Sequence, residues 1–262
     1  MELNGKKDKL EACIRAKGKL AVAFSYGVDS TYLLKAAHDV LGDNVIAVIA
    51  KHVAFPEKEY IGAISFCERE GINAVTVEHD MLALPEVRSN PKDRCYHCKK
   101  ALMSGFLKAA YERGFDTVAD GTNADDDFGD RPGMRALAEL GIISPLKEAG
   151  LTKADIRELS KDLNLPTWDK PSLACLATRI PTGTELSADV MKRIDESELY
   201  IRSLGFSQVR VRAEVGTARI EIYPEEFGRI VESDTAKKID KTLKELGFSH
   251  VTLDLKGYGN GN

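Results

Sequence analysis

Six residues near the N-terminus, positions 25–30 with the sequence SYGVDS, combine small hydroxyl groups, a glycine and an acid. They end an apolar run at residues 19–25 and lead into a helical pattern that we expect to begin at Ser30. A turn from a buried strand into a helix directs several backbone N–H groups at one point, where the helix dipole also favours negative charge. The segment therefore predicts a phosphate site, and the plainer alternative is an N-capped helix after a turn.

The side chains of this loop comprise hydroxyl donors and one acid. Ser25, Ser30 and Thr31 can donate to phosphate oxygens. Asp29 would repel a phosphate, so we expect it to hold Mg²⁺ or to orient the loop. The phosphate-binding residues predicted here are Ser25, Gly27, Val28, Asp29, Ser30 and Thr31.

A second candidate segment is residues 120–126, DGTNADD, which follows a strand-like run at residues 116–119. Open α/β sheets place their ligand-binding loops at the carboxyl ends of strands. We therefore expect Gly121 and Asn123 to bind the same ligand. A solvated acidic turn is the alternative, because Gly, Asn and Asp are common in turns.

The five cysteines are an odd number, and we expect metal binding or catalysis rather than a disulfide framework. Cys13 and Cys67 lie in helical patterns and are predicted to be core residues. Cys95 and Cys98 form a CxxC pair just before a helical pattern at residues 98–113, whereas Cys175 is distant in sequence. Three thiolates suit a [4Fe–4S] cluster with one open iron, which could hold sulfide. Zinc with His97 as fourth ligand, a redox dithiol and no metal at all stay open as alternatives.

The elements that must position these residues alternate between strand and helix. Buried strands are predicted by apolar runs and helices by amphipathic ones, in the order strand 19–25, helix 30–41, strand 44–50, helix 56–70, strand 72–78, helix 98–113 and strand 116–119. This alternation indicates an α/β fold with a parallel sheet covered on both sides.

The pattern changes near residue 180. We expect a helix at residues 189–204 ending at Gly205, a hairpin of strands 208–213 and 218–223, helices at 224–233 and 235–246, and a strand at 249–255. This order predicts a smaller α+β domain. We place the boundary within residues 169–183, which gives domains 1–180 and 181–262.

The loop at residues 25–30 resembles that of the PP-loop ATP pyrophosphatase superfamily, Ser-Gly-Gly-x-Asp-Ser, which includes GMP synthetase, NAD synthetase and tRNA thiolation enzymes. The resemblance implies an adenine nucleotide hydrolase-like fold that splits ATP between its α- and β-phosphates and attaches AMP to the substrate. Tyr26 stands where the pattern has its first glycine. If that position needs φ > 0, Tyr26 is strained; otherwise its ring covers the nucleotide.

Residues 175–181, CLATRIP after Lys170-Pro171, resemble a narrower family, the LarE sulfur transferases of nickel-pincer nucleotide synthesis. The resemblance implies that ATP adenylates a carboxylate of a pyridinium dicarboxylate mononucleotide and that sulfur then displaces AMP. It also implies that Cys175 is the sulfur-carrying residue, either within the cluster ligated by Cys95, Cys98 and Cys175 or by sacrificing its own sulfur. The remaining positions implied to bind substrate or cofactor are Arg179, Glu198, Arg210, Arg212 and Glu221. Arg210 and Arg212, at i and i+2, would lie on one strand face and fork around a phosphate.

The composition of the chain limits the classes of molecule that it is expected to bind. The 262 residues carry a net charge of -4, which disfavours a broad nucleic-acid-binding face. No apolar stretch approaches the roughly 20 residues that span a bilayer, and the N-terminal segment contains acids, unlike a secretory signal. We expect a cytoplasmic enzyme, a homo-oligomer by resemblance, that uses ATP, Mg²⁺, a small nucleotide substrate and sulfide or another sulfur donor. The alternatives are tRNA thiolation, an amide-forming PP-loop ligase and a non-enzymatic nucleotide-binding module.

Overall fold

The computed structural model describes residues 2–126, 132–171 and 174–259. The chain forms two compact units, the first of Met1–Met81 with Asp93–Leu173 and the second of Leu82–Lys92 with Ala174–Asn262. The two positions 172 and 173 of the segment in which we expected the boundary lie outside the described residues. The assignment of separate roles to domains 1–180 and 181–262 remains a prediction.

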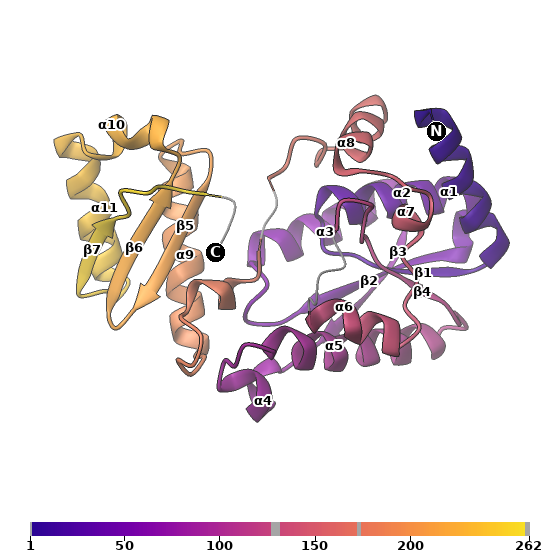
Figure 1. The fold of residues 1–262 in the computed structure, drawn as a ribbon, viewed down its shortest axis with the longest axis horizontal. Helices are drawn as coiled ribbons and strands as arrows, with labels where there is room; N and C mark the ends of the chain where they lie inside the picture. The colour runs from indigo at the N-terminus through magenta and orange to yellow at the C-terminus, as the bar shows by residue number, and fades with distance from the viewer. Residues whose placement is uncertain (1, 127–131, 172–173, 260–262) are drawn as a thin grey trace. The chain divides into compact units, whose positions relative to one another are not determined.

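The first unit contains a four-stranded parallel sheet (Figure 1). Its strands are β1 (Leu20–Ala23), β2 (Val45–Lys51), β3 (Asn73–Glu78) and β4 (Val118–Ala119), in the spatial order β3-β2-β1-β4. Each falls within or beside its predicted run, so the expected parallel α/β sheet is confirmed. The chain leaves β1 toward β2 and later returns to add β4 on the other side, which makes the gap between β1 and β4 a topological switch point.

Helices cover both faces of this sheet (Figure 1). The helices of the first unit are α1 (Leu3–Lys17), α2 (Val28–Leu41), η1 (Gly42–Asn44), α3 (Glu57–Glu70), α5 (Arg94–Tyr111), α6 (Pro132–Glu139), α7 (Pro145–Glu148) and α8 (Lys153–Asp162). Alternate strand residues enter two cores: Val22 and Ile49 pack with α1–α3 and α8, whereas Ala21 and Val48 pack with α5 and α6. Burial on both faces explains why the strands read as unbroken apolar runs.

Two helices begin earlier than their sequence patterns predict. α2 starts at Val28, not Ser30, because the carbonyl of extended Gly27 already accepts the N–H of Thr31 at 2.9 Å. α5 starts at Arg94, not residue 98, so the CxxC pair lies within the first five residues of the helix and not before it. Cysteine and histidine have modest helix propensity and carry no apolar periodicity, which is why the first turn of α5 was missed.

The second unit is the expected small α+β assembly. Its helices are η2 (Met81–Ala83, at the entry to the unit), α4 (Pro85–Arg88), η3 (Leu176–Arg179), α9 (Ala188–Ser203), η4 (Pro224–Glu226), α10 (Phe227–Ile230) and α11 (Ser233–Glu245). The hairpin of β5 (Val209–Glu214) and β6 (Thr217–Ile222) is antiparallel, and β7 (His250–Leu253) pairs with β6 in parallel. Gly205 has φ +89° after α9, as predicted for its C′ position. The predicted helix 224–233 is two short helices instead.

Leu82–Lys92 joins the second unit through Asn90, which is fully buried. The Asn90 side-chain amide donates to the carbonyl of Pro181 at 2.8 Å, and its own carbonyl accepts the N–H of Gly183 at 2.8 Å. A side chain about ninety positions away in sequence thus fixes the chain that follows η3. No described helix is long and apolar enough to cross a membrane.

Candidate active site

The loop at residues 25–30 is held open by its own hydrogen bonds. The Ser30 hydroxyl lies 3.1 Å from that of Ser25 and accepts the Ser25 N–H at 3.3 Å. The fully buried Thr31 hydroxyl donates to the Gly27 carbonyl at 2.8 Å. Val28 is buried in the core. Ser25, Gly27 and Ser30 thus line the open side of the loop, while Val28 and Thr31 shape it from behind.

Asp29, in the first turn of α2, is engaged by two distant groups. The Asn123 amide donates to one carboxylate oxygen at 3.3 Å, and the Lys153 ammonium contacts the other. The Lys153 backbone N–H also donates to Asp125 at 2.7 Å. These contacts fit the loop-orienting role considered for Asp29. Lys153 is a site residue that sequence reasoning missed.

The start of α8 could be predicted from the sequence, but the contact of its first residue, Lys153, with Asp29 could not. Thr152 and Asp155 form a capping box at this helix terminus, a local signal. Lys153 then meets Asp29 from 124 positions away, which no local pattern specifies.

Gly121 brings the loop after β4 against the loop after β1. A Cβ at residue 121 would lie 2.9 Å from the Ser30 backbone nitrogen and 3.2 Å from its Cα. The preceding Asp120 is buried and accepts hydrogen bonds from the hydroxyls of Thr122 at 2.5 Å and Ser144 at 2.7 Å. Glycine is therefore required where the two loops meet at the switch point.

The two loops open into a cavity of about 620 Å³ in the first unit, a volume suited to a nucleotide-sized ligand. Its wall includes polar residues of the two loops and Lys99, together with the apolar side chains of Phe24, Leu102, Met103 and Phe106. The polar and metal-binding types in its wall are Ser25, Asp29, Ser30, His52, Cys95, Lys99, Asp120, Thr122 and Asp126. Burial, with a smaller effect of His79, lowers the pKa of His52 to about 4, so this ring is neutral near pH 7.

Cys95 and Cys98 lie one helical turn apart at the start of α5, on the same helix face. Cys95 is exposed and Cys98 partly buried. His97 lies 3.2 Å from the carboxylate of Asp93 in the same turn. Within the described residues no group of three or more His, Cys, Asp or Glu side chains is arranged to hold a metal. Cys175 is exposed and belongs to the second unit.

The other two cysteines have different surroundings. Cys67 is buried, as predicted, and burial raises its pKa to about 12. Cys13 is only partly buried, with its sulfur 3.5 Å from a Glu148 oxygen, so the prediction of a core residue was wrong for Cys13. Burial and the Glu148 charge raise its pKa. Neither thiol is poised as a nucleophile.

Tyr26 adopts the left-handed conformation that the first glycine of the loop pattern would allow, with φ +56°. Its ring is not part of the cavity wall but packs against Phe24 and Phe66, with centroid separations of 6.1 and 6.2 Å. Of the two explanations for Tyr26, backbone strain holds, and a left-handed non-glycine residue costs about 1–3 kcal/mol.

In the second unit, a buried ion pair fixes the turn that carries Cys175. Arg179 and Glu198 are 3% and 2% exposed, and Arg179 Nε donates to Glu198 at 2.9 Å. Glu198 also accepts from Arg202 at 2.8 Å and from the Val211 N–H at 3.0 Å. Arg179 Nη1 donates to the carbonyls of Ala174 at 2.8 Å and Cys175 at 3.3 Å. The pair therefore sets the backbone around Cys175.

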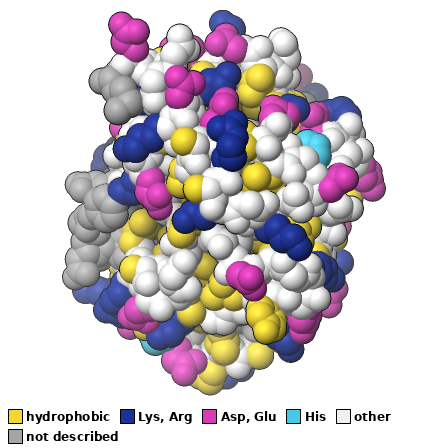
Figure 2. Space-filling view, turned by 90° about the vertical axis from the view of Figure 1, so that its right-hand side faces the viewer, with side chains coloured by type: hydrophobic (Ala, Val, Ile, Leu, Met, Phe, Trp, Pro, Cys, Tyr) yellow, Lys and Arg dark blue, Asp and Glu magenta, His cyan; other side chains and the backbone are white. Residues whose placement is uncertain are grey.

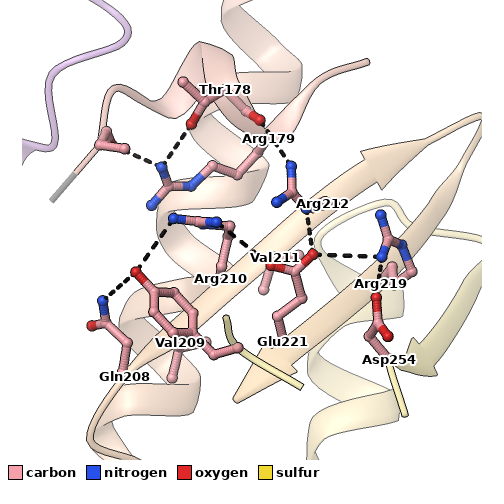
Figure 3. Close-up of polar contacts among 12 residues, drawn as sticks. Thr178, Arg179, Gln208, Val209, Arg210, Val211, Arg212, Arg219, Glu221 and Asp254 are labelled. Carbon is pink, nitrogen blue, oxygen red and sulfur yellow. Dashed lines mark hydrogen bonds and ion pairs between the residues drawn. The ribbon is translucent and has the colours of Figure 1, made fainter. Parts of the chain in front are cut away.

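Arg210 and Arg212 lie on one face of β5, as their spacing predicts, with Glu221 opposite on β6 (Figure 3). Arg212 Nε donates to Glu221, and an Arg210 nitrogen lies 3.7 Å from the same carboxylate. Arg212 also donates to the carbonyl of Thr178 at 3.2 Å. Arg219 also lies 3.5 Å from Glu221 and pairs with Glu214 and Asp254, so three guanidinium groups and three carboxylates form one network on the second unit, next to the Cys175 turn.

The strand order, with a phosphate-type loop and a glycine-tight second loop meeting at the switch point, defines an ATP-using enzyme of the PP-loop class. One component of the glutamine-hydrolysing GMP synthase of Thermococcus kodakarensis is 27% identical over 162 residues, which cover 57% of this chain and 52% of that protein. This similarity supports the class.

The similarity to two further proteins extends over nearly the whole chain. The pyridinium-3,5-bisthiocarboxylic acid mononucleotide synthase of Lactiplantibacillus plantarum is 38% identical over 257 residues, 98% of this chain and 92% of that enzyme. An uncharacterised Synechocystis protein is also 38% identical, over 99% of this chain and 97% of its own length. No protein-family model matches the chain. The chain belongs to the LarE family of ATP-dependent sulfur transferases, which confirms the resemblance found in its sequence.

Replacing Gly121 by Ala tests the contact between the two loops. The added Cβ would lie too close to the Ser30 backbone, so one loop must move, and we expect ATP affinity to fall about tenfold or more. Gly228→Ala is the matched control, since its Cβ would meet nothing within 4 Å. The measurement is equilibrium binding of ATP to both variants. Equal affinities would contradict a role for the contact between the two loops in ATP binding.

Replacing Glu198 by Gln tests the ion pair behind Cys175. Because Arg179 would keep a buried charge without its carboxylate, we expect a loss of about 3 kcal/mol in unfolding free energy, measured by thermal unfolding. Glu196→Gln is the control on the same helix, where a half-exposed side chain lies 3.9 Å from Lys192. The control should lose less than about 0.5 kcal/mol. Similar losses in the two variants would show that the buried pair is not special.

Proposed function

We propose that this enzyme adenylates a carboxylate of a pyridinium dicarboxylate mononucleotide and then replaces one carboxylate oxygen with sulfur. The product of the Lactiplantibacillus relative, a bisthiocarboxylic acid mononucleotide, supports this substrate. The observation that carries the proposal is the place of Cys95, which lies in the wall of the same cavity as Ser25, Ser30 and Gly121. A sulfur-bearing side chain and a phosphate-type loop thus line one cavity.

In the first half-reaction a carboxylate oxygen of the substrate attacks the α-phosphorus of ATP, and pyrophosphate leaves. We assign the phosphates to the Ser25 and Ser30 hydroxyls and to the backbone N–H groups at the start of α2. We also assign to them the positive charge of Lys99, which lies in the wall of the same cavity. Asp29, fixed by Asn123 and Lys153, orients the loop, while Mg²⁺ travels with the nucleotide.

In the second half-reaction a sulfur nucleophile attacks the carbonyl carbon of the acyl adenylate. AMP departs with the electron pair of the broken C–O bond and takes one former carboxylate oxygen with it. The thiocarboxylate remains. Adenylation is needed because a carboxylate is a poor acyl donor, whereas AMP is a stable leaving group.

In this proposal, residues of the second unit bind the mononucleotide substrate. Arg210 and Arg212 would bind the phosphate of the mononucleotide, with Glu221 holding both guanidinium groups on one strand face. Arg179 and Glu198 act behind them by fixing the turn of Cys175. A role for the same unit in homo-oligomer formation is part of the proposal by family resemblance.

Cys95, Cys98 and Cys175 would hold a [4Fe–4S] cluster in this proposal. The exposed and half-buried thiols one turn apart on α5 fit two ligands of a cluster. When bound, such a cluster offers an open iron that can hold an exogenous sulfide. The alternative is that the thiolate of Cys175, in the family motif, displaces AMP itself; its Cβ–S bond then breaks by elimination, which leaves the thiocarboxylate on the substrate and dehydroalanine at position 175.

A small-molecule substrate suits the surface better than tRNA. In Figure 2, Lys and Arg side chains are interspersed with Asp and Glu side chains on one face of the molecule. The net charge of -4 likewise gives a polyanion little overall attraction.

Iron and sulfide analysis of anaerobically purified protein tests the sulfur source. We expect roughly four irons per chain, lost in the Cys95→Ser, Cys98→Ser and Cys175→Ser variants. Cys13→Ser, which changes a partly buried thiol outside the site, is the control that should retain them. Protein without iron that loses one Cys175 sulfur per turnover would replace the cluster by the sacrificial route.

A lack of pyrophosphate release with any pyridinium dicarboxylate would contradict the adenylation step itself.

A further inference from the structure

The segment just before Cys175 makes an unusual set of contacts with the nucleotide loop. Lys170, five positions before Cys175, donates from its ammonium to the carbonyl of Tyr26 at 2.8 Å. The same ammonium stands 4.1 Å from the centre of the Tyr26 ring. It also contacts the carboxylate of Glu59, a residue of α3 that is only 7% exposed. One largely buried cation thus joins the loop, α3 and the chain that leads to Cys175.

The backbone of Lys170 is fixed as well as its side chain. Arg157, on α8, donates to the carbonyls of Trp168 and Lys170, both at 2.8 Å. The Lys170 N–H donates to the Thr167 carbonyl at 3.1 Å. The ammonium therefore approaches Tyr26 from a rigid support.

The Tyr26 ring also lies against Gly62 of α3. A Cβ at Gly62 would lie 2.3 Å from the ring, so α3 leaves space for the tyrosine only by having glycine there. The ring is enclosed by Gly62, Phe24 and Phe66 and covered by the Lys170 ammonium. The family pattern needs none of this, because a glycine at position 26 would adopt a positive φ without strain.

We propose that Lys170 is a positioning residue of the nucleotide loop: with Glu59, it holds Tyr26 in its left-handed conformation and so keeps the Ser25–Ser30 loop in the shape that binds ATP. The hydrogen bond to the Tyr26 carbonyl orients the peptide that precedes Gly27. The interaction of the cation with the aromatic ring keeps the side chain against α3. The inference rests on the proposed role of this loop in binding ATP.

The test is equilibrium binding of ATP to the full-length protein carrying Lys170→Met together with Glu59→Gln. The paired change avoids leaving a buried carboxylate alone. We expect affinity to fall about tenfold, the effect of about 1.4 kcal/mol. Lys161→Met removes an exposed lysine that stacks on Trp168 outside the loop, and it should leave affinity unchanged.

A second background separates positioning from general stability. In Tyr26→Gly protein the loop no longer needs holding, so the same paired change should weaken ATP binding by less than about threefold. Lys170→Arg, which keeps a donor and a cation, should fall between wild type and the paired variant. Thermal unfolding of each variant records any loss of stability separately from the change in affinity.

The outcomes are distinct. Unchanged affinity in the paired variant would overturn the role of Lys170 while leaving the proposed function intact. An equal loss of affinity in the wild-type and Tyr26→Gly backgrounds would do the same. Wild-type protein that binds no ATP would overturn both.

Discussion

The close approach of Gly121 to the backbone of Ser30 is the constraint on which the first unit depends. It occurs at the switch point of a parallel sheet, where the chain leaves β1 in one direction and β4 lies in the other. Main chain must meet main chain there, so that N–H groups and small hydroxyls from both loops surround one cavity. Asn123 and Lys153 then converge on Asp29 and fix the start of α2. The nucleotide-binding surface thus depends on the switch point between β1 and β4 and on the absence of a Cβ at Gly121.

In the second unit, ion pairs fix the candidate site residues, whereas in the first unit a close contact between two stretches of backbone does so. The buried pair of Arg179 and Glu198 holds the carbonyls of the Cys175 turn, and a neighbouring network joins Arg212 to Glu221 and to Thr178 (Figure 3). Buried ion pairs add little net stability but are costly to break. Their effect here is geometric, because they fix the backbone of the Cys175 turn beside the strand that carries Arg210 and Arg212.

Much of this was readable from sequence because the signals were local. Unbroken apolar runs indicated the strands, and the six-residue loop and the Cys175 motif indicated the family. Helix starts at Val28 and Arg94 were missed because their first turns lack apolar periodicity. The contacts of Lys153 with Asp29 and of Lys170 with Tyr26 span 124 and 144 positions, so only the folded chain reveals them. In the sequence, Tyr26 was visible only as a departure from the loop pattern. The folded chain explains it, because Gly62 leaves space for the tyrosine ring.

Isotopic labelling of the substrate carboxylate tests the central claim most directly. If a carboxylate oxygen attacks the α-phosphorus of ATP and sulfur later displaces AMP, that oxygen must leave on the phosphate of AMP. We therefore expect substrate labelled with ¹⁸O in its carboxylates to yield AMP carrying one ¹⁸O for each thiocarboxylate formed. Unlabelled AMP accompanying the same product would contradict adenylation of the substrate and, with it, this account of the enzyme.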